Sequence, residues 1–296
     1  KYIKYFIIAG VAIIGIFLYA QEESDPDRLY TQGNEILSSL NNEPVILKGV
    51  VSDYFRYGMN GGYPQTQGGL KSELKKIETL QEKGANINLI GLYLSGADEI
   101  EENITELDSY INYAKNNGIY IYLAPVGSGF VETVSKESEK EAWHKEYFKK
   151  VMPGDLEKLT ELLSSRYGDY PNVIYQLTAE PSMTYKNWVS LQSVLAKIVR
   201  KYSDNLIMAS MPYYAPYRTL PAIEYDNIIY SVGGYVSRNN ESRSERTIKE
   251  IIGAENLRKS YPVIVSEFGG NYNSDFSSVR DLSLLKEIMD EINHNN

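Results

Sequence analysis

The chain contains no cysteine and only two histidines, His144 and His294, among its 296 residues. Disulfide bonds, thiolate catalysis and cysteine metal sites are therefore excluded. Two histidines also leave almost no residues from which to build a histidine-based catalytic triad or metal centre. The chemistry that remains open to this protein rests on carboxylates, hydroxyls, amines and phenols.

Positive charge is also scarce, since 30 lysines and arginines face 39 aspartates and glutamates and give a net charge of -9. An acidic surface argues against nucleic acid or anionic lipid as the main partner, and it leaves a neutral ligand such as a glycan open. The sequence does not indicate an oligomeric state. Tyrosine, by contrast, is abundant with 26 copies. Most of these rings are expected to fill half-buried surface positions, and some to line a groove where they stack on sugar faces.

Residues 1–20 contain a long apolar run. Lys1 and Lys4 precede an uncharged run from Tyr5 to Ala20, and acidic residues follow at once. This charge pattern orients the N-terminus towards the cytoplasm and the remainder outside. The run is shorter than the roughly 20 residues of a typical transmembrane helix, but Lys4 can snorkel. A cleaved signal peptide is the alternative, although Leu18-Tyr19-Ala20 is a poor cleavage site.

These features predict the organisation of the chain. Residues 1–20 are expected to be a signal peptide or transmembrane anchor, and the membrane is then a partner through this segment. Residues 21–32 are expected to be a linker. The globular part should be extracellular or at the cell surface.

From about residue 33 the pattern alternates between strands and helices. A turn at residues 41–44 separates Ile36–Leu40 from Val45–Val51, which predicts a small hairpin leading into a first buried strand. Six further apolar runs lack strict alternation, as expected for strands buried on both faces of a parallel sheet. They are Ala85–Leu94, Ile119–Pro125, Val173–Thr178, Leu206–Ser210, Ile228–Val232 and Val263–Glu267.

Helical periodicity occurs between most of these strands, and Gly84 and Gly118 stand where helix C-caps are expected. The predicted helices are Leu70–Lys83, Ile104–Asn116, Asp155–Tyr167, Asn187–Tyr202, Glu245–Lys259 and Leu282–Asn293. Alternating strands and helices indicate βαβ units, and no linker divides residues 33–296, so one domain is expected. Seven strands are visible where a closed barrel needs eight. The fold class predicted is an α/β (β/α)8 TIM barrel that is truncated before strand eight, with an open doubly wound sheet as the alternative.

Two glutamates stand at the carboxyl ends of predicted strands, where parallel barrels build their active sites. Glu180 follows the fourth strand and Glu267 ends the seventh. On opposite sides of a barrel they would face each other across its mouth. Glycosidic cleavage needs such a pair, because one carboxyl protonates the leaving oxygen while the other attacks the anomeric carbon or activates water. Burial and mutual repulsion would keep one protonated and the other ionised. For either glutamate alone, a surface charge or a helix N-cap contact is the plainer explanation.

The segments around these glutamates resemble those of family-5 glycoside hydrolases, and the match covers most of residues 33–270. The stretches that carry Glu180 and Glu267 are the specific ones, and the others are supportive. The matching segments are Asn34–Val51 with NEPVILKGVV, Gly84–Ile90, Pro171–Pro181 with PNVIYQLTAEP, Ile228–Ser231 followed by Tyr235, and Tyr261–Gly269 with YPVIVSEFG.

The resemblance implies a retaining glycoside hydrolase that cleaves O-glycosidic bonds of a polysaccharide or oligosaccharide. Glu180 would be the acid/base, Glu267 the nucleophile, and Tyr235 the residue that contacts the nucleophile. No metal or organic cofactor would be needed. Two loops at the same mouth are expected to bind the carbohydrate substrate, unless their side chains serve plain packing. They carry Asp53, Tyr54 and Phe55 after strand one, and Tyr213 and Tyr214 after strand five.

The sequence departs from the family pattern around the two glutamates. The family's arginine falls on Gly91, and its asparagine before the acid/base falls on Ala179. The usual histidine after strand three has no counterpart in Leu123–Val126, and that on strand six falls on Gly233 or Gly234. A counterpart of the family's strand-eight tryptophan, if the protein has one, would lie beyond residue 296.

Losing such supporting residues commonly degrades catalysis. Either the site is rebuilt for an unusual sugar, for example one without a free 2-hydroxyl, or a catalytically impaired barrel binds glycan at the cell surface without cutting it. A structural cell-surface role is the third possibility. The retained pair of glutamates favours the hydrolase.

Overall fold

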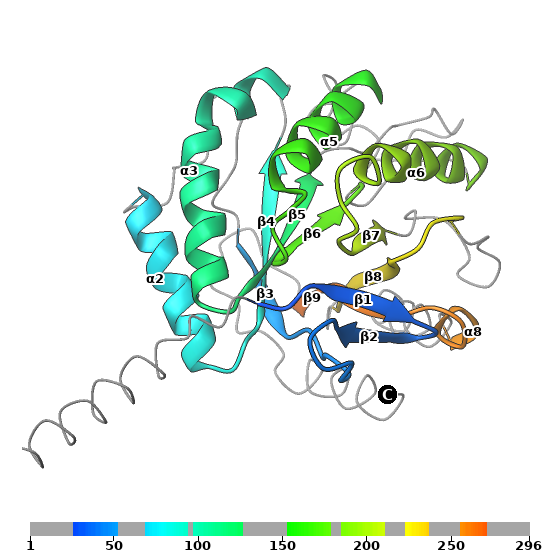
Figure 1. The fold of residues 1–296 in the computed structure, drawn as a ribbon, viewed down its shortest axis with the longest axis horizontal. Coiled ribbons are helices and arrows are strands. Elements are labelled where there is room, and N and C mark those ends of the chain that lie inside the picture. The colour runs from blue at the N-terminus through cyan, green and yellow to red at the C-terminus, as the bar shows by residue number, and fades with distance from the viewer. Residues whose placement is uncertain are drawn as a thin grey trace, which may run out of the picture.

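The computed structural model describes residues 26–52, 69–93, 97–126, 153–178, 185–210, 223–236 and 255–270. Within them, seven parallel strands form one curved sheet in which neighbours in space are also neighbours in sequence (Figure 1). The strands are β3 (Gly49–Ser52), β4 (Ile87–Tyr93), β5 (Tyr120–Val126), β6 (Val173–Gln176), β7 (Ile207–Ser210), β8 (Ile228–Val236) and β9 (Val263–Gly270). A doubly wound sheet needs a point where this order reverses. The doubly wound alternative is therefore wrong.

Helices cover the outer face of the sheet (Figure 1). They are α2 (Gly69–Glu82), α3 (Ala97–Asn116), α5 (Pro153–Tyr167), α6 (Tyr185–Val199) and α8 (Glu255–Arg258). The first four agree with the predicted helices to within a few residues, except that α3 begins seven residues earlier than expected. Of the predicted helix Glu245–Lys259, the described part holds only α8, and the predicted helix Leu282–Asn293 lies outside the described residues.

The ends of α2 and α3 explain why the helices stop where they do. Gly84 and Gly118 have φ angles of 75° and 68°, in the left-handed region that glycine adopts without strain. After α2, the Ala85 N–H donates to Leu80 O and the Gly84 N–H to Gln81 O. This pair of bonds is the Schellman motif, which satisfies carbonyls at the end of a helix. Gly118 makes the same arrangement after α3, so both predicted C-caps are confirmed.

Two apolar clusters lie on the two faces of the sheet. The larger packs the outward strand residues, such as Ile90, Ile121 and Ile207, against the helices. The smaller fills the inner face with alternate residues of the same strands, among them Tyr122, Ile174, Met208 and Ile229. Strands with apolar residues on both faces explain why the sequence shows continuous apolar runs instead of alternation.

A hairpin of β1 (Leu29–Gln32) and β2 (Glu35–Ser38) covers the end of the sheet where the strands begin, called here the amino end (Figure 1). Leu29 and Ile36 are buried there against Ile87 and Tyr120, the first residues of β4 and β5. The hydroxyl of Tyr120 donates to Asp27 O at 2.7 Å. The folded domain therefore begins before residue 33.

This hairpin corrects one prediction. Residues 29–32 were assigned to a linker but form a strand, and a turn at Gly33-Asn34 joins this strand to β2. A two-residue hairpin loop favours left-handed backbone, which Gly33 supplies with φ 60°. The turn predicted at residues 41–44 is confirmed: Asn42 has a φ of 59°, Ser38 N donates to Glu43 O at 3.0 Å, and Val45 N donates to Ile36 O at 2.8 Å. The pairing across it is short, with one antiparallel bridge between Leu37 and Pro44.

Arg200 binds together the segments that enter β7 and β8. Its Nη1 donates to Ser203 O and Asn205 O, both at 2.9 Å, and its Nη2 donates to Asp226 O at 2.7 Å. Next to it, Asn227 adopts a φ of 56° and accepts a hydrogen bond from Thr31 N of β1 at 3.0 Å. The hairpin is thereby tied to the start of β8.

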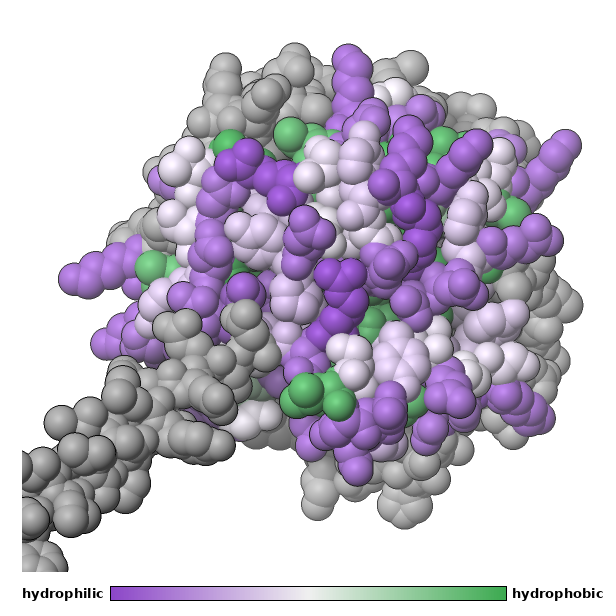
Figure 2. All heavy atoms as spheres, viewed as in Figure 1, coloured by the Kyte–Doolittle hydropathy of each residue, from purple (hydrophilic) through white to green (hydrophobic). Residues whose placement is uncertain are grey.

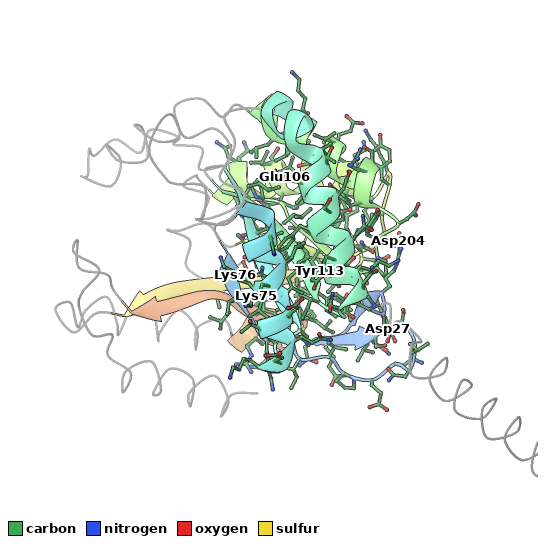
Figure 3. All side chains as sticks on the ribbon, turned by 90° about the vertical axis from the view of Figure 1, so that its left-hand side faces the viewer. Asp27, Lys75, Lys76, Glu106, Tyr113 and Asp204 are labelled. Atoms are coloured by element: carbon green, nitrogen blue, oxygen red, sulfur yellow. The ribbon has the colours of Figure 1, made fainter. Side chains whose placement is uncertain are left out.

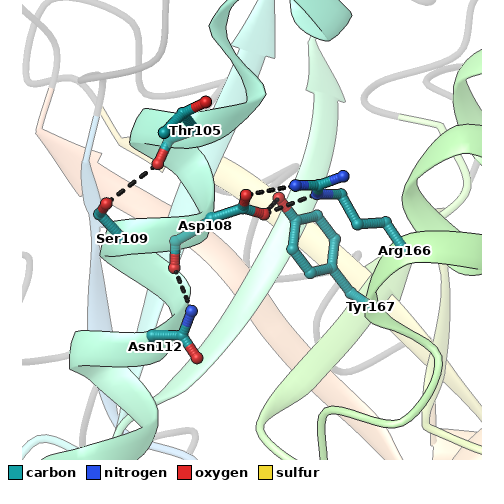
Figure 4. A network of polar contacts seen from close by, with 6 residues as sticks. All are labelled: Thr105, Asp108, Ser109, Asn112, Arg166 and Tyr167. Atoms are coloured by element: carbon teal, nitrogen blue, oxygen red, sulfur yellow. Dashed lines mark hydrogen bonds and ion pairs between the residues drawn. The ribbon is translucent and has the colours of Figure 1, made fainter.

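Polar contacts also join neighbouring helices at the surface. Asp108 of α3 accepts from Arg166 of α5 through both carboxylate oxygens, and the hydroxyl of Tyr167 donates to the same carboxylate at 2.9 Å (Figure 4). Tyr113 of α3, labelled in Figure 3, donates to Glu78 of α2.

The face shown in Figure 2 is mainly hydrophilic. Among the described residues, none of the helices has the length and apolarity needed to cross a bilayer. Residues 1–20 lie outside that part.

Candidate active site

The carboxyl end of the sheet is the end where the strands stop, and it holds the backbone of two predicted site residues. Glu267 lies in β9 and Tyr235 in β8. Glu180 lies outside the described residues, two positions after Thr178, the last described residue that follows β6. Five predicted substrate-binding residues also lie outside the described residues: Asp53, Tyr54, Phe55, Tyr213 and Tyr214.

A β-bulge sets the register of Glu267. Ser231 pairs with Ile264 and Val232 with Val265, but Gly233 pairs with Glu267, so Ser266 is an extra residue in β9. Paired residues of a parallel ladder share a face of the sheet, and alternation from Ser231 assigns position 233 to the inner face. The bulge therefore puts position 267 on the inner face at the carboxyl end. Without it, alternation from Ile264 would put position 267 on the helix-covered face.

Three polar side chains on the inner face form a hydrogen-bonded chain across β6, β7 and β8, called here the inner polar chain. Gln176 Nε2 donates to Ser210 Oγ, and Ser231 Oγ lies 3.2 Å from the same oxygen. All three residues are buried. Gln176 Oε1 has no donor among the described residues. The sequence shows this chain as polar residues inside apolar runs, a signal that sequence reasoning passed over.

Solvent exposure along the inner face changes at the level of this chain. Met208 and Ile229 are 0% exposed, whereas Ser210 and Ser231, two residues further along the same strands, are 5% and 3% exposed. Gln176 is 6% exposed. Along β7 and β8, buried polar residues thus follow apolar ones towards the carboxyl end, as expected below a site at that end of a parallel sheet.

Helix α6 anchors the ends of β6 and β7 from the outer side. Its Trp188, fully buried, donates from Nε1 to Ser210 O at 2.8 Å. Gln192 of the same helix donates from Nε2 to Thr178 Oγ1 at 2.8 Å, two residues before Glu180. These buried bonds fix the strand ends from which Glu180 follows.

Two of the positions that depart from the family pattern, Gly91 and Gly233, belong to described strands. Gly91 pairs with Ala124, which belongs to the inner apolar cluster, and Gly233 pairs with Glu267. Both glycines therefore occupy inner-face positions and bring no side chain to them. In the described part of the chain, no group of three histidine, cysteine, aspartate or glutamate residues is arranged to hold a metal ion.

Several solved structures share this fold. The cellulase Cel5C_n superposes with a TM-score of 0.62 at 14% sequence identity, covering 93% of this chain and 80% of its own. The catalytic domain of Thermobifida fusca endoglucanase Cel5A gives 0.62 at 14%, covering 90% and 82%. Pseudomonas stutzeri endoglucanase Cel5A gives 0.57 at 16%, covering 83% and 80%. At these identities the likeness establishes the fold.

The sequence itself establishes the family. No curated protein matched the chain significantly. The family described as cellulase (glycosyl hydrolase family 5) matches residues 59–296, which include Glu180, Tyr235 and Glu267. This match spans well over half of the sequence and agrees with the resemblance seen in its strand-end motifs. The chain belongs to glycosyl hydrolase family 5.

Proposed function

We propose that this protein is a glycoside hydrolase that cleaves O-glycosidic bonds of a polysaccharide or oligosaccharide with retention of anomeric configuration. Family membership supports the reaction class. Among similar structures, two are named endoglucanases, and a variant of the Thermobifida fusca catalytic domain is in complex with cellotetraose. The observation that carries the proposal is the bulge that pairs Glu267 with Gly233 on the inner face at the carboxyl end.

In the proposed reaction, a Glu267 carboxylate oxygen attacks the anomeric carbon while the Glu180 carboxyl donates its proton to the leaving oxygen. The glycosidic bond breaks and a covalent glycosyl-enzyme ester forms. Glu180, now ionised, takes a proton from water, and the resulting oxygen attacks the same carbon and releases Glu267. Tyr235 orients Glu267. Two inversions at one carbon give net retention.

The remaining parts of the proposal concern the surroundings of the pair. The seven parallel strands belong to a (β/α)8 barrel, and the loops with Asp53, Tyr54, Phe55, Tyr213 and Tyr214 bind the sugar. Residues 1–20 direct the chain to or through a membrane, so the domain works outside the cell. Deleting residues 1–20 should leave the protein in the cytoplasm of an expression host, which cell fractionation measures.

Replacing Glu267 with Gln tests the nucleophile. Turnover of cellotetraose and of aryl β-glycosides should fall by at least about 10⁴-fold, while the thermal transition stays within a few degrees. Glu224→Gln, an exposed glutamate before β8, is the matched control and should keep wild-type turnover. Unchanged turnover in the E267Q variant would refute the assignment.

Product stereochemistry separates retention from inversion. Proton NMR of the first product should show the β-anomer before mutarotation. In the Glu267→Gly variant, azide should restore turnover of an activated aryl glycoside and yield the α-glycosyl azide, because azide then replaces the missing carboxylate. An α-anomer as the first wild-type product would point to inversion instead. Saturable oligosaccharide binding without hydrolysis would favour the binding-only alternative.

A further inference from the structure

One hydrogen-bond acceptor of the inner polar chain, Gln176 Oε1, has no donor among the described residues. Gln176 supplies its amide N–H to Ser210, but its Oε1 is buried without a donor among the described residues. A buried carbonyl oxygen that lacks a hydrogen bond costs about 1–3 kcal/mol. Such a group is normally satisfied by a bound molecule, and an unsatisfied polar atom next to a candidate site marks a place where a ligand donor fits.

The inner-face neighbours of Gln176 differ in size on its two sides. Towards β7 the space holds Met208, its ladder partner, and Ser210. Towards β5, the register continues one step beyond the pair Leu123–Tyr175 and brings Ala124 beside Gln176. Ala124 in turn pairs with Gly91 on β4. The two inner-face positions on that side therefore contribute a single methyl group between them.

The position of Gln176 along β6 also places it just below the candidate site. It lies four residues before Glu180 on the strand that leads to it, and Ser231, the far end of the chain, lies two residues before the position that pairs with Glu267. Gln176, Ser210 and Ser231 are buried but keep 6%, 5% and 3% exposure, whereas Met208 and Ile229 are 0% exposed.

We propose that Gln176, held by Ser210 and Ser231, is a carbohydrate-binding residue at the floor of the site, where its Oε1 accepts a hydrogen bond from one sugar hydroxyl. This inference rests on the proposed function and adds a recognition residue to it. Ser210 and Ser231 are positioning residues, because they act through the amide of Gln176. The alternative donor of this hydrogen bond to Gln176 Oε1 is a bound water molecule.

The test compares Gln176→Met with Asn88→Leu. Methionine keeps the length of the side chain and removes both polar atoms. Asn88 is the matched control because it is a buried amide of the same sheet, donates one bond to Tyr110 at 2.6 Å, and also has an oxygen without a donor among the described residues. It faces the helices and not the site. Both variants should lower the thermal transition, but only Q176M should weaken cellotetraose binding, by about tenfold.

A deoxy-sugar series gives a second measurement, and its wild-type arm does not depend on the stability of any variant. Wild-type protein should lose about tenfold in affinity for one oligosaccharide that lacks a single hydroxyl, and Q176M should bind that analogue and its parent equally. Ser231→Ala, a smaller change, should show a weaker loss of the same kind.

The outcomes separate this inference from the proposed function. If wild-type protein cleaves the oligosaccharide but Q176M binds every analogue as tightly as wild type does, Gln176 holds a water and the inference is overturned alone. If wild-type protein neither binds nor cleaves any oligosaccharide of the series, both the proposed function and this inference fail.

Discussion

The two ends of the sheet are built in opposite ways. At the amino end a hairpin covers the strands, and polar groups such as the Arg200 guanidinium and the Asn227 amide form hydrogen bonds with backbone groups. At the carboxyl end the inner face turns to polar residues such as Ser210 and Ser231. Buried amide oxygens without a donor among the described residues occur at both ends, at Asn172 and Asn205 near the strand entrances and at Gln176 and Gln192 near the strand exits. The Gln176 oxygen differs from the others because it belongs to the inner polar chain below the candidate site. Variants at the two ends should separate stability from activity.

The largest effect on stability is expected from Arg200→Met at the amino end. This change leaves several carbonyls of the β7 and β8 entrances without their donor, so the free energy of unfolding should fall by about 3 kcal/mol in urea titrations. Hydrolysis per folded molecule should stay at the wild-type value. Lys201→Met is the control, since Lys201 is exposed and makes only a 3.7 Å ion pair with Glu161. A loss of activity that exceeds the loss of folded protein would show that the amino end also affects activity, which contradicts the proposed difference between the two ends.

Asn227 offers a finer test at the same end. Asn227→Ala should cost about 2 kcal/mol, because it removes the bonds to Thr31 and Asp204 and forces alanine into the left-handed region. Asn227→Gly removes the same bonds without that strain and should be about 1 kcal/mol more stable than the alanine variant. Equal stabilities, measured by urea unfolding, would mean that the backbone conformation contributes nothing.

Trp188→Phe probes the carboxyl end from the helix side. The change removes the donor to Ser210 O and should lower the free energy of unfolding by about 1.5 kcal/mol. It should also reduce kcat/KM for cellotetraose, since Ser210 holds Gln176. Preserved kcat/KM in this variant would show that α6 supports the strand without influencing the site.

The smallest effect is expected in the helix layer, which belongs to neither end. The Arg166 guanidinium holds the pKa of the Asp108 carboxyl below its ordinary 3.8, so the pair stabilises the protein above that pH and loses this contribution as the pH falls through the lowered pKa. Because Arg166 is largely exposed, water screens the pair, and Asp108→Asn should cost about 0.5 kcal/mol at pH 7. The stability difference between this variant and wild type should shrink below pH 3.8; a difference independent of pH would remove the electrostatic explanation.

Much of the framework could be predicted from the sequence because its signals are local. Apolar runs mark the seven parallel strands, and Gly84 and Gly118 mark helix ends through backbone conformations that few other residues adopt. Strand β1 was missed because its four residues carry a weak apolar pattern, and only the burial of Leu29 against β4 and β5 makes them part of the domain. The register of Glu267 was beyond prediction, since Ser266 becomes an extra residue only through its pairing with β8. The inner polar chain likewise depends on contacts between strands.

The hydrogen bond between Thr31 and Asn227 joins residues 196 positions apart, whereas every βα unit in between docks on its immediate predecessor. During synthesis the hairpin is made long before its partner Asn227 at the start of β8. The sheet can accordingly grow one unit at a time as the chain emerges, with mostly local contacts that form quickly. The hairpin can cover Ile87 and Tyr120 as soon as β5 has been made, so Leu29 and Ile36 find apolar partners early. Its bond to Asn227 is a late event of assembly, and this bond closes the amino end only after β8 has joined the sheet.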